Sequence, residues 1–417
     1  MNTVDAYPKV LEPGQHPIKK EDVGLEALWI IQRLHNAGFT SYIVGGSVRD
    51  MLLGRLPKDI DISTSATPEQ LQELFANIRL IGKRFLIAHI YFRDGKIIDV
   101  STFRALPSKN HPLEIVKNDN RYGSPIEDAQ RRDLTINGLF YDLHEDIVID
   151  YVDGLEDLEQ GKIRAIGNPY VSFQEDPVRM LRAIRHAARC RFEIEETTWL
   201  AIRRHATLIH QASHVRVREE FIRELQYGSA RRAIRLMQSS GILRELSRTL
   251  DKWLGNTGPW KRKKGSRRRF GPYSTPSWAT PAAFWRRLIE LDKRMPECAF
   301  WEDGIILLFL FLPMFWAEVY QHTHPPMKTS QLWHQCFQDG LNPIVRELSL
   351  TVQQKELMEQ VLQVHWRLHL YPEQRQLTNA IKRSPVLPQA LKVLELELAS
   401  EQMKVPSVYD TFLNRTK

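Results

Sequence analysis

A glycine turn followed closely by two alternating carboxylates is the feature that most constrains this chain. The apolar residues that lead into Gly45 and Gly46 predict a strand, and the residues after them predict a short helix that carries Arg49. Asp59 and Asp61 then lie in a second predicted strand. Because successive side chains point to opposite faces of a strand, these carboxylates share one face while the isoleucines beside them point to the core.

Two carboxylates on one face repel each other unless a cation neutralises them. Mg²⁺ takes oxygen ligands and is often held by one or two carboxylates together with substrate phosphates. The paired glycines let the backbone approach a ligand, and the start of the following helix offers free N–H groups to a phosphate. Alone, Gly-Gly is usually a turn and Asp-x-Asp a solvated strand end. Their combination around Arg49 favours a metal-dependent nucleotidyl transferase.

Length, charge and cysteine content limit the other possibilities. With 417 residues, two or three domains are expected. The 58 Lys and Arg exceed the 50 Asp and Glu, and a net charge of +8 suits a polyanionic partner. The 3 scattered cysteines predict neither disulfides nor a zinc site, and they favour a reducing compartment. Since the first residues contain no apolar segment typical of a signal peptide, we expect a cytoplasmic protein.

Changes in composition and in hydrophobic pattern divide the chain into four predicted parts. Residues 1–22 are expected to be a flexible leader, 23–167 the catalytic head, 168–240 a helical part, and 241–417 a further helical part whose basic loop suits RNA. The longest apolar run, 305–317, is interrupted by a proline and is shorter than the roughly 20 residues of a membrane span. We therefore expect a buried helix there and no association with a membrane.

The predicted head contains further polar residues that could serve the site. Two alternating segments around Arg93-Asp94-Gly95 predict a β-hairpin. Asp99 lies on its second arm and is a possible third carboxylate, although an exposed polar position explains it equally well. Residues 105–127 are rich in Pro, Asn, Lys and Gly, and irregular connections of this length are often functional. Asp133 and Asn137 are four residues apart on a predicted helix and so share a face.

Two later segments carry charges that suit a nucleotide or RNA. Asp176, Arg179 and Arg182 fall on roughly one face of a predicted helix, where they could bind a base edge or phosphates, or simply form a solvated salt-bridged face. Lys261–Arg269 has seven cations in nine residues, within a predicted basic loop at 260–272. Cations near aromatic residues suit single-stranded RNA, and a merely solubilising loop is the alternative. The flanking aromatic residues are Trp260, Phe270, Tyr273 and Trp278.

Four motifs in this order resemble the class II tRNA nucleotidyltransferase and bacterial poly(A) polymerase family. The resemblance covers roughly residues 25–190 and fades beyond about residue 230. It implies an α+β fold in which a polymerase-β-like head with a small mixed sheet precedes an all-helical remainder. Residues 168–240 would then be a helical neck that recognises the nucleotide, and 241–417 a helical body and tail that binds RNA. It also implies two Mg²⁺ ions, ATP as substrate and no nucleic-acid template. The motifs are Gly45-Gly46-Ser47-Val48-Arg49-Asp50, Asp59-Ile60-Asp61, Arg131-Arg132-Asp133-Leu134-Thr135-Ile136-Asn137 and Glu175-Asp176-Pro177-Val178-Arg179-Met180-Leu181-Arg182.

The resemblance implies a role for each residue of these motifs. Asp59 and Asp61 would hold the metals, and Asp133 would be the third catalytic acid. One metal would lower the pKa of the RNA 3′-hydroxyl, and the other would steady the triphosphate and the leaving pyrophosphate. The remaining positions would contact the nucleotide: Gly45, Gly46, Arg49, Arg131 and Arg132 at the triphosphate, and Asp176, Arg179 and Arg182 at the base.

Details of the sequence indicate which reaction to expect. Residues 81–85, 88–90 and 130–133, with the long basic tail, look more like bacterial poly(A) polymerases than CCA-adding enzymes. Ser47 and Gly138 depart from the usual family residues without removing a ligand. We therefore expect AMP to be added from ATP to the single-stranded 3′ end of RNA, as in mRNA polyadenylation, with the basic loop as the RNA contact. CCA addition to tRNA and a non-catalytic RNA-binding module are the alternatives.

Overall fold

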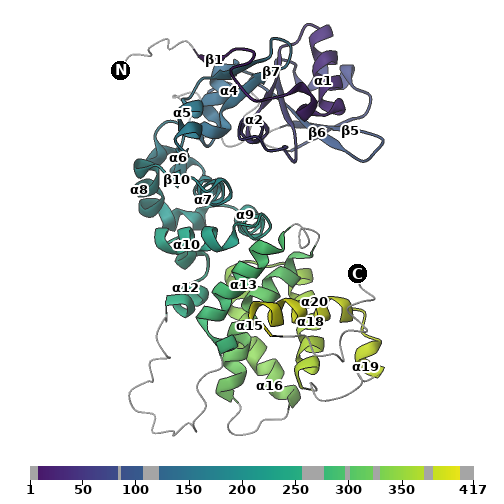
Figure 1. Ribbon diagram of the computed structural model, residues 1–417, viewed down its shortest axis with the longest axis vertical. Helices are drawn as coiled ribbons and strands as arrows, with labels where there is room; N and C mark the ends of the chain where they lie inside the picture. Colours follow the sequence, from purple (N-terminus) through teal and green to yellow (C-terminus); the bar gives the residue numbers. More distant parts are fainter. Residues whose placement is uncertain are drawn as a thin grey trace. The chain divides into compact units, whose positions relative to one another are not determined.

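The protein forms two compact units. A computed structural model, shown in Figure 1, describes residues 8–82, 86–106, 122–255, 277–295, 301–322, 329–370 and 379–403. The first unit comprises Met1–Glu175 and Cys190–Ala201, and the second comprises Asp176–Arg189 and Ile202–Lys417. The finer division into leader, head, neck and body stays a prediction, except that Lys9–Leu11 of the expected flexible leader form a strand paired with residues 148–150 and therefore belong to the sheet.

The described residues of the first unit are organised around an eight-stranded sheet with the strand order β1-β8-β7-β2-β3-β6-β5-β4. Neighbouring strands are antiparallel except β3 and β6, which are parallel. The expected mixed sheet is therefore confirmed. The strands are β1 (Lys9–Leu11), β2 (Ser41–Val44), β3 (Asp61–Thr64), β4 (Ile78–Ile81), β5 (Ile87–Tyr91), β6 (Ile97–Thr102), β7 (Leu139–Asp142) and β8 (Ile147–Asp150).

Short helices accompany this sheet. Ile31 and Leu34 of α1 are fully buried in one apolar core with Ile43 of β2 and Ile62 of β3. The core thus fixes the strands that carry the predicted catalytic residues. The helices are α1 (Leu25–Asn36), α2 (Gly46–Leu52), α3 (Pro68–Leu74), α4 (Pro125–Arg131), α5 (Gly154–Glu159) and α6 (Pro169–Glu175), with α8 (Glu196–His205) at the unit boundary.

The local predictions around the glycine turn are largely confirmed. A strand ends at Val44, a helix begins at Gly46, and the predicted β-hairpin is formed by β5 and β6. Strand β3 begins at Asp61 rather than before Asp59, because its ladder with β2 starts at the Val44–Asp61 pair. The predicted alternation nevertheless extends into the turn, since Ile60 is buried and Asp59 is exposed.

The described residues of the second unit are helical, as predicted. The helices are α7 (Val178–Cys190), α9 (His214–Leu225), α10 (Ala230–Ser240), α11 (Ile242–Leu246), α12 (Arg248–Gly255), α13 (Pro281–Lys293), α15 (Asp303–His322), α16 (Thr329–Cys336), α17 (Asn342–Glu347), α18 (Val352–Leu370), α19 (Asn379–Lys382) and α20 (Leu387–Ser400). The helix α15 contains the long apolar run. Its segment Asp303–Tyr320 is apolar and long enough to cross a membrane, yet it is 83% buried against neighbours that include α13 and α18. The prediction of a buried helix is confirmed.

Candidate active site

Three carboxylates gather at one end of the central strands. Asp61 is the exposed first residue of β3, and Asp59 is exposed two residues before it. Asp61 pairs in register with Asp99 on the parallel strand β6. Burial raises the pKa of Asp99 and the negative charge of Asp59 raises it further, whereas His89, whose Nε2 lies 3.2 Å from Asp99 Oδ1, opposes this shift. The crowding of negative charge predicted from the sequence thus includes Asp99.

Gly45 lies directly beside these carboxylates. Its φ is +77° and its N–H donates to the carbonyl of Leu139 at 3.1 Å. A Cβ atom at this position would lie 3.0 Å from Nη1 of Arg132 and 4.0 Å from Oδ2 of Asp61. Any other residue would be strained by the positive φ, and its Cβ atom would be crowded by these neighbours, so glycine is required here. The turn therefore brings the backbone next to one carboxylate and one guanidinium.

Arg49 is buried beneath the turn. Its Nε and Nη2 donate to Oδ1 of Asp50 at 2.9 and 2.7 Å, and its Nη1 donates to Oδ1 of Asn137 at 2.6 Å. With 1% of the residue exposed, its guanidinium is in position to hold α2 against the segment after α4. Its predicted contact with the triphosphate stays a prediction.

The two consecutive arginines of the third motif point to different partners. Nη2 of Arg132 donates to Oδ2 of Asp128 at 2.9 Å and to Oγ of Ser63 at 3.2 Å, and the guanidinium lies 5.3 Å from the ring centre of Phe140. Arg131 donates to the carbonyl of Ala105. Arg132 is therefore the one placed at the glycine turn.

Asp133 is held in a buried polar network after the end of α4 at Arg131, so the prediction of one helix that carries both Asp133 and Asn137 was wrong. Its Oδ1 accepts from the N–H of Leu134 at 2.9 Å and from Nδ2 of Asn137 at 3.3 Å. Asn137 in turn accepts from Arg49. The structure thus joins Asp133 to Arg49 through Asn137, and it joins Asp61 to Asp99 through strand register. A catalytic role for Asp133 stays a prediction.

The predicted base-recognition residues belong to the second unit. The carboxylate of Asp176, just before α7, accepts two hydrogen bonds from Arg216 of α9, at 3.1 and 2.7 Å. Arg179 is on the first turn of α7, and Nη1 of Arg182 lies 3.8 Å from Oε1 of Glu220. Sequence reasoning missed Arg216, because a partner 40 residues away leaves no local signal.

The predicted basic loop, Lys261–Arg269, lies outside the described residues, as do residues 107–121 of the long polar connection. Of the aromatic residues that flank the basic loop, Trp278 is described. Its ring meets that of Trp316 edge-to-face, with 5.5 Å between ring centres. Trp278 therefore packs against α15, which carries Trp316, within the second unit.

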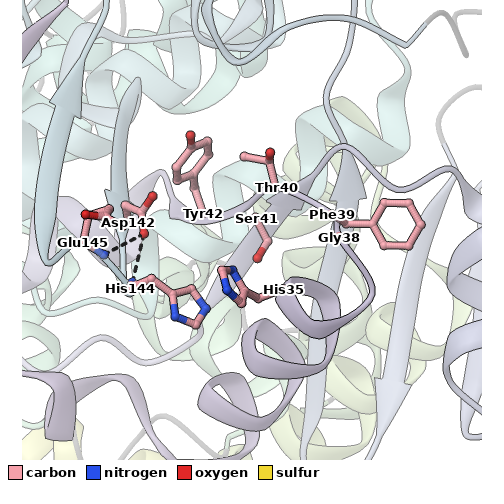
Figure 2. A pocket seen from close by; sticks show the side chains of 9 residues that line it. All are labelled: His35, Gly38, Phe39, Thr40, Ser41, Tyr42, Asp142, His144 and Glu145. Atoms are coloured by element: carbon pink, nitrogen blue, oxygen red, sulfur yellow. Dashed lines mark hydrogen bonds between the residues drawn. The ribbon is translucent and has the colours of Figure 1, made fainter.

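Figure 2 shows a cavity of about 350 Å³. It lies at the end of the β2–β3 ladder that is away from Asp61. Ser41 in its lining pairs with Thr64 in the β2–β3 ladder, whereas Asp61 pairs three positions further along. The rings of His35 and His144 lie there with centres 3.9 Å apart and planes tilted by 31°, and burial followed by the charge of His35 lowers the pKa of His144. Its lining residues are His35, Gly38, Phe39, Thr40, Ser41, Tyr42, Asp142, His144 and Glu145.

A mixed sheet that brings clustered carboxylates to a glycine turn defines a nucleotidyltransferase head. Residues 41–164 match the model of the poly A polymerase head domain, and residues 191–254 match that of the probable RNA and SrmB-binding site of polymerase A. Poly(A) polymerase I of Salmonella typhimurium is 33% identical over 404 residues, covering 94% of this chain and 82% of its own. The chain therefore belongs to the poly(A) polymerase family.

CCA-adding enzymes are also related to this chain. The enzyme of Lactobacillus helveticus is 41% identical over 208 residues, which is 49% of this chain and 51% of that enzyme. The crystal structure of the Bacillus stearothermophilus CCA-adding enzyme in complex with CTP has a TM-score of 0.64 at 25% identity, covering 95% of this chain and 82% of that one. These comparisons confirm the predicted family and the polymerase-β-like fold.

Proposed function

We propose that this protein is a template-independent polynucleotide adenylyltransferase that adds AMP from ATP to RNA 3′ ends. The observation that carries the proposal is the cluster of Asp59, Asp61 and Asp99 beside the glycine turn. The choice of polyadenylation is supported by sequence similarity to Poly(A) polymerase I along most of the chain, whereas the similarity to the Lactobacillus helveticus CCA-adding enzyme spans about half of it. A cytoplasmic location accords with this function.

The carboxylates suit two Mg²⁺ ions. Mg²⁺ prefers oxygen ligands, and a cation would stabilise the charged form of Asp99, whose pKa is raised mainly by burial and further by the charge of Asp59. We propose that Asp59, Asp61 and Asp99 hold the ions. Asp99 would then be the third catalytic acid, the role that the family resemblance implied for Asp133. Bound there, Mg²⁺ would activate the RNA 3′-hydroxyl and offset charge on the α-phosphate and the pyrophosphate.

The chain's own residues position the substrates. The backbone at Gly45 and Gly46 gives the triphosphate close access, and Arg132 offsets negative charge that develops there. Arg49, held by Asn137, keeps the turn in place. We propose that Asp176 and Arg179, with Arg182 beside them, recognise the base.

CCA addition is the second candidate function. The likeness of the fold to a CCA-adding enzyme along 95% of this chain favours it, because neck and body would then serve a tRNA. The basic loop Lys261–Arg269 favours the first candidate, since clustered cations bind single-stranded RNA without requiring a tRNA shape.

The test is nucleotide incorporation by the purified protein with Mg²⁺. An unstructured RNA primer and a tRNA that lacks CCA are each incubated with ATP or CTP singly. Long extension of the primer with ATP alone is expected. Addition restricted to the tRNA, with CTP required before ATP, would instead establish the CCA-adding reaction. Normal incorporation by Asp59→Ala would refute catalysis at this site, and Mg²⁺-dependent ATP binding separates an enzyme from a silent RNA-binding module.

A further inference from the structure

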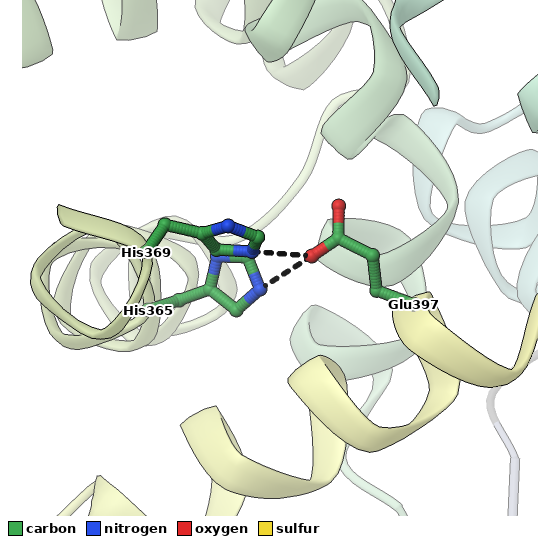
Figure 3. A group of neighbouring side chains, drawn as sticks. All are labelled: His365, His369 and Glu397. Atoms are coloured by element: carbon green, nitrogen blue, oxygen red, sulfur yellow. Dashed lines mark hydrogen bonds and ion pairs between the residues drawn. The ribbon is translucent and has the colours of Figure 1, made fainter. Parts of the chain in front are cut away.

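Two histidines and a glutamate converge inside the helical unit. His365 and His369 lie one turn apart on α18, and Glu397 lies on α20. Figure 3 shows the two imidazoles each with a ring nitrogen close to the same carboxylate oxygen. Nε2 of His365 and Nε2 of His369 lie 2.8 and 2.9 Å from Oε2 of Glu397. Three potential metal-ligand atoms therefore lie within 4.8 Å of one another.

The other oxygen of this carboxylate is held by separate partners. Nη2 of Arg287 and Nε1 of Trp316 both donate to Oε1 of Glu397, the latter at 2.9 Å. Arg287 also donates to the carbonyl of Phe309 at 2.7 Å, so the guanidinium itself is fixed. Carboxylates that bind metals are usually oriented by such outer hydrogen bonds. Oε2 is thereby presented to the two imidazoles.

The orientation of His365 supports a ligand role. This residue is fully buried, and neither of its ring nitrogens forms a hydrogen bond of normal geometry among the described residues, although Nε2 lies close to Glu397. A ring nitrogen that binds an ion directs its lone pair at the ion and not at the neighbouring ligand atom. A close nitrogen–oxygen pair with a misaligned axis is the arrangement that a shared ion requires.

We propose that His365, His369 and Glu397 form a binding site for a transition-metal ion of the Zn²⁺ class. Imidazole nitrogen with one carboxylate oxygen suits Zn²⁺ and Co²⁺, whereas Mg²⁺ prefers oxygen alone. In a tetrahedral zinc site the ligand atoms lie about 3.3 Å apart, so the present contacts need to open by roughly half an ångström. The side chain of His369 is 33% exposed, which leaves room for water as a fourth ligand.

The ion would link α18 to α20 and stabilise the helical unit, because a ligand that binds the folded state alone raises its stability. Arg287 already balances the charge of Glu397, so we expect weaker binding than at a site built of several thiolates. The site is separate from the Mg²⁺ chemistry proposed for the head. A negative result for this metal site would therefore leave the proposed adenylyltransferase function unaffected, and the converse also holds.

The test compares the full-length protein with two single histidine variants. His369→Gln removes one proposed ligand at a partly exposed position, and His334→Gln removes an exposed histidine of α16 as the matched control. Each protein is freed of metal with a chelator and titrated with Zn²⁺ and Co²⁺ in excess Mg²⁺. Bound metal is measured by mass spectrometry, Co²⁺ geometry by visible absorption, and stability by thermal unfolding.

The wild type and His334→Gln should each bind one more equivalent of Zn²⁺ than His369→Gln, show the intense absorption of tetrahedral Co²⁺, and melt several degrees higher with metal. His369→Gln should lose all three effects while its metal-free melting temperature stays near that of the wild type. Equal metal content in the wild type and His369→Gln would overturn the proposal. So would Co²⁺ spectra that do not differ between them, and the cluster would then be a metal-free ion network.

Discussion

At the scale of single residues, catalysis depends on which carboxylates meet. Asp61 and Asp99 are register partners on parallel strands, and the charge of Asp59 acts on Asp99. Asp133 instead accepts hydrogen bonds from Leu134 and Asn137. The pairing of Asp61 with Asp99 resembles a metal site, whereas the hydrogen bonds of Asp133 resemble a structural network. Removing the charge of Asp99 and removing that of Asp133 should therefore have different effects.

Asp99→Asn should reduce the rate of AMP incorporation by at least about 100-fold with little change in melting temperature, because it removes a ligand charge at an accessible position. Asp133→Asn should mainly lower the melting temperature. Asp94→Asn, in the turn of the same hairpin, is the control and should retain activity. Primer extension and thermal unfolding are measured for each. A fully active Asp99→Asn would leave the third-acid role to Asp133.

Gly45→Ala tests the crowding at the turn. A methyl group there meets Arg132 at 3.0 Å in addition to the strain of a positive φ. Gly38 has a similar φ of +81° with nothing within 4 Å of an added Cβ, so Gly38→Ala measures the effect of a positive φ without crowding. We expect about 1–3 kcal/mol of destabilisation from strain in each variant and a further loss, together with lost activity, only at Gly45. Equal effects in urea denaturation and primer extension would contradict this expectation.

At the scale of elements, α9 organises the second unit through buried and paired charges. Arg216 holds Asp176, Glu220 binds Arg185, and Glu224 is fully buried with both oxygens unpaired among the described residues. A helix that holds the proposed base-recognition residue by a two-bond ion pair should influence which nucleotide is used.

Arg216→Ala should raise KM for ATP by about tenfold and reduce discrimination against CTP, because the Asp176 carboxylate loses a bidentate partner. Arg216→Lys should recover little, since an ammonium cannot donate in the same fork. Arg218→Ala, on the same helix but bonded to the Ser349 carbonyl, is the control. Steady-state kinetics with ATP and with CTP measure both effects. If Arg216→Ala prefers ATP over CTP as strongly as the wild type does, Asp176 does not take part in base recognition.

Glu224→Gln should stabilise the protein at neutral pH. Burial raises the pKa of Glu224 well above its usual value, Glu220 adds to the rise and Arg185 opposes it. The stability contributed by a carboxyl group with a raised folded-state pKa is present below the unfolded pKa and is lost as pH rises through the folded pKa. The variant should gain about 1–3 kcal/mol over the wild type at pH 8 and nothing near pH 4.

Urea denaturation from pH 4 to pH 8 measures this difference. The exposed neighbour Glu219 provides the control, since Glu219→Gln should leave the pH dependence of the unfolding free energy as in the wild type. A constant difference between Glu224→Gln and the wild type across this range would mean that the carboxyl group is not responsible.

At the scale of the whole molecule, a net charge of +8 should govern RNA binding. Replacing Lys261, Arg262, Lys263 and Lys264 with serine should weaken binding of an unstructured RNA. The slope of log affinity against log salt concentration should become shallower by about 0.7 for each phosphate that the variant no longer neutralises. Fluorescence anisotropy at several salt concentrations measures the slope. The same slope in the variant would show that the basic loop does not bind RNA.

Much of this molecule could be predicted from its sequence. The residues around Gly45 and Asp61 predicted a strand, a turn and a second strand, because local alternation and glycine placement are short-range signals. The same kind of signal predicted the hairpin of β5 and β6 and the buried helix α15. Motif order along the chain identified the family.

Only the tertiary structure decided which distant residues meet. That Asp99 lies beside Asp61 follows from the parallel pairing of β3 with β6, and a crossover leaves no trace in local periodicity. For the same reason, the sequence did not reveal that Arg216 binds Asp176, or that Glu397 of α20 meets His365 and His369 of α18. Sequence determines what each segment can form and which chemistry it carries, whereas packing over long separations decides which of those groups share a site.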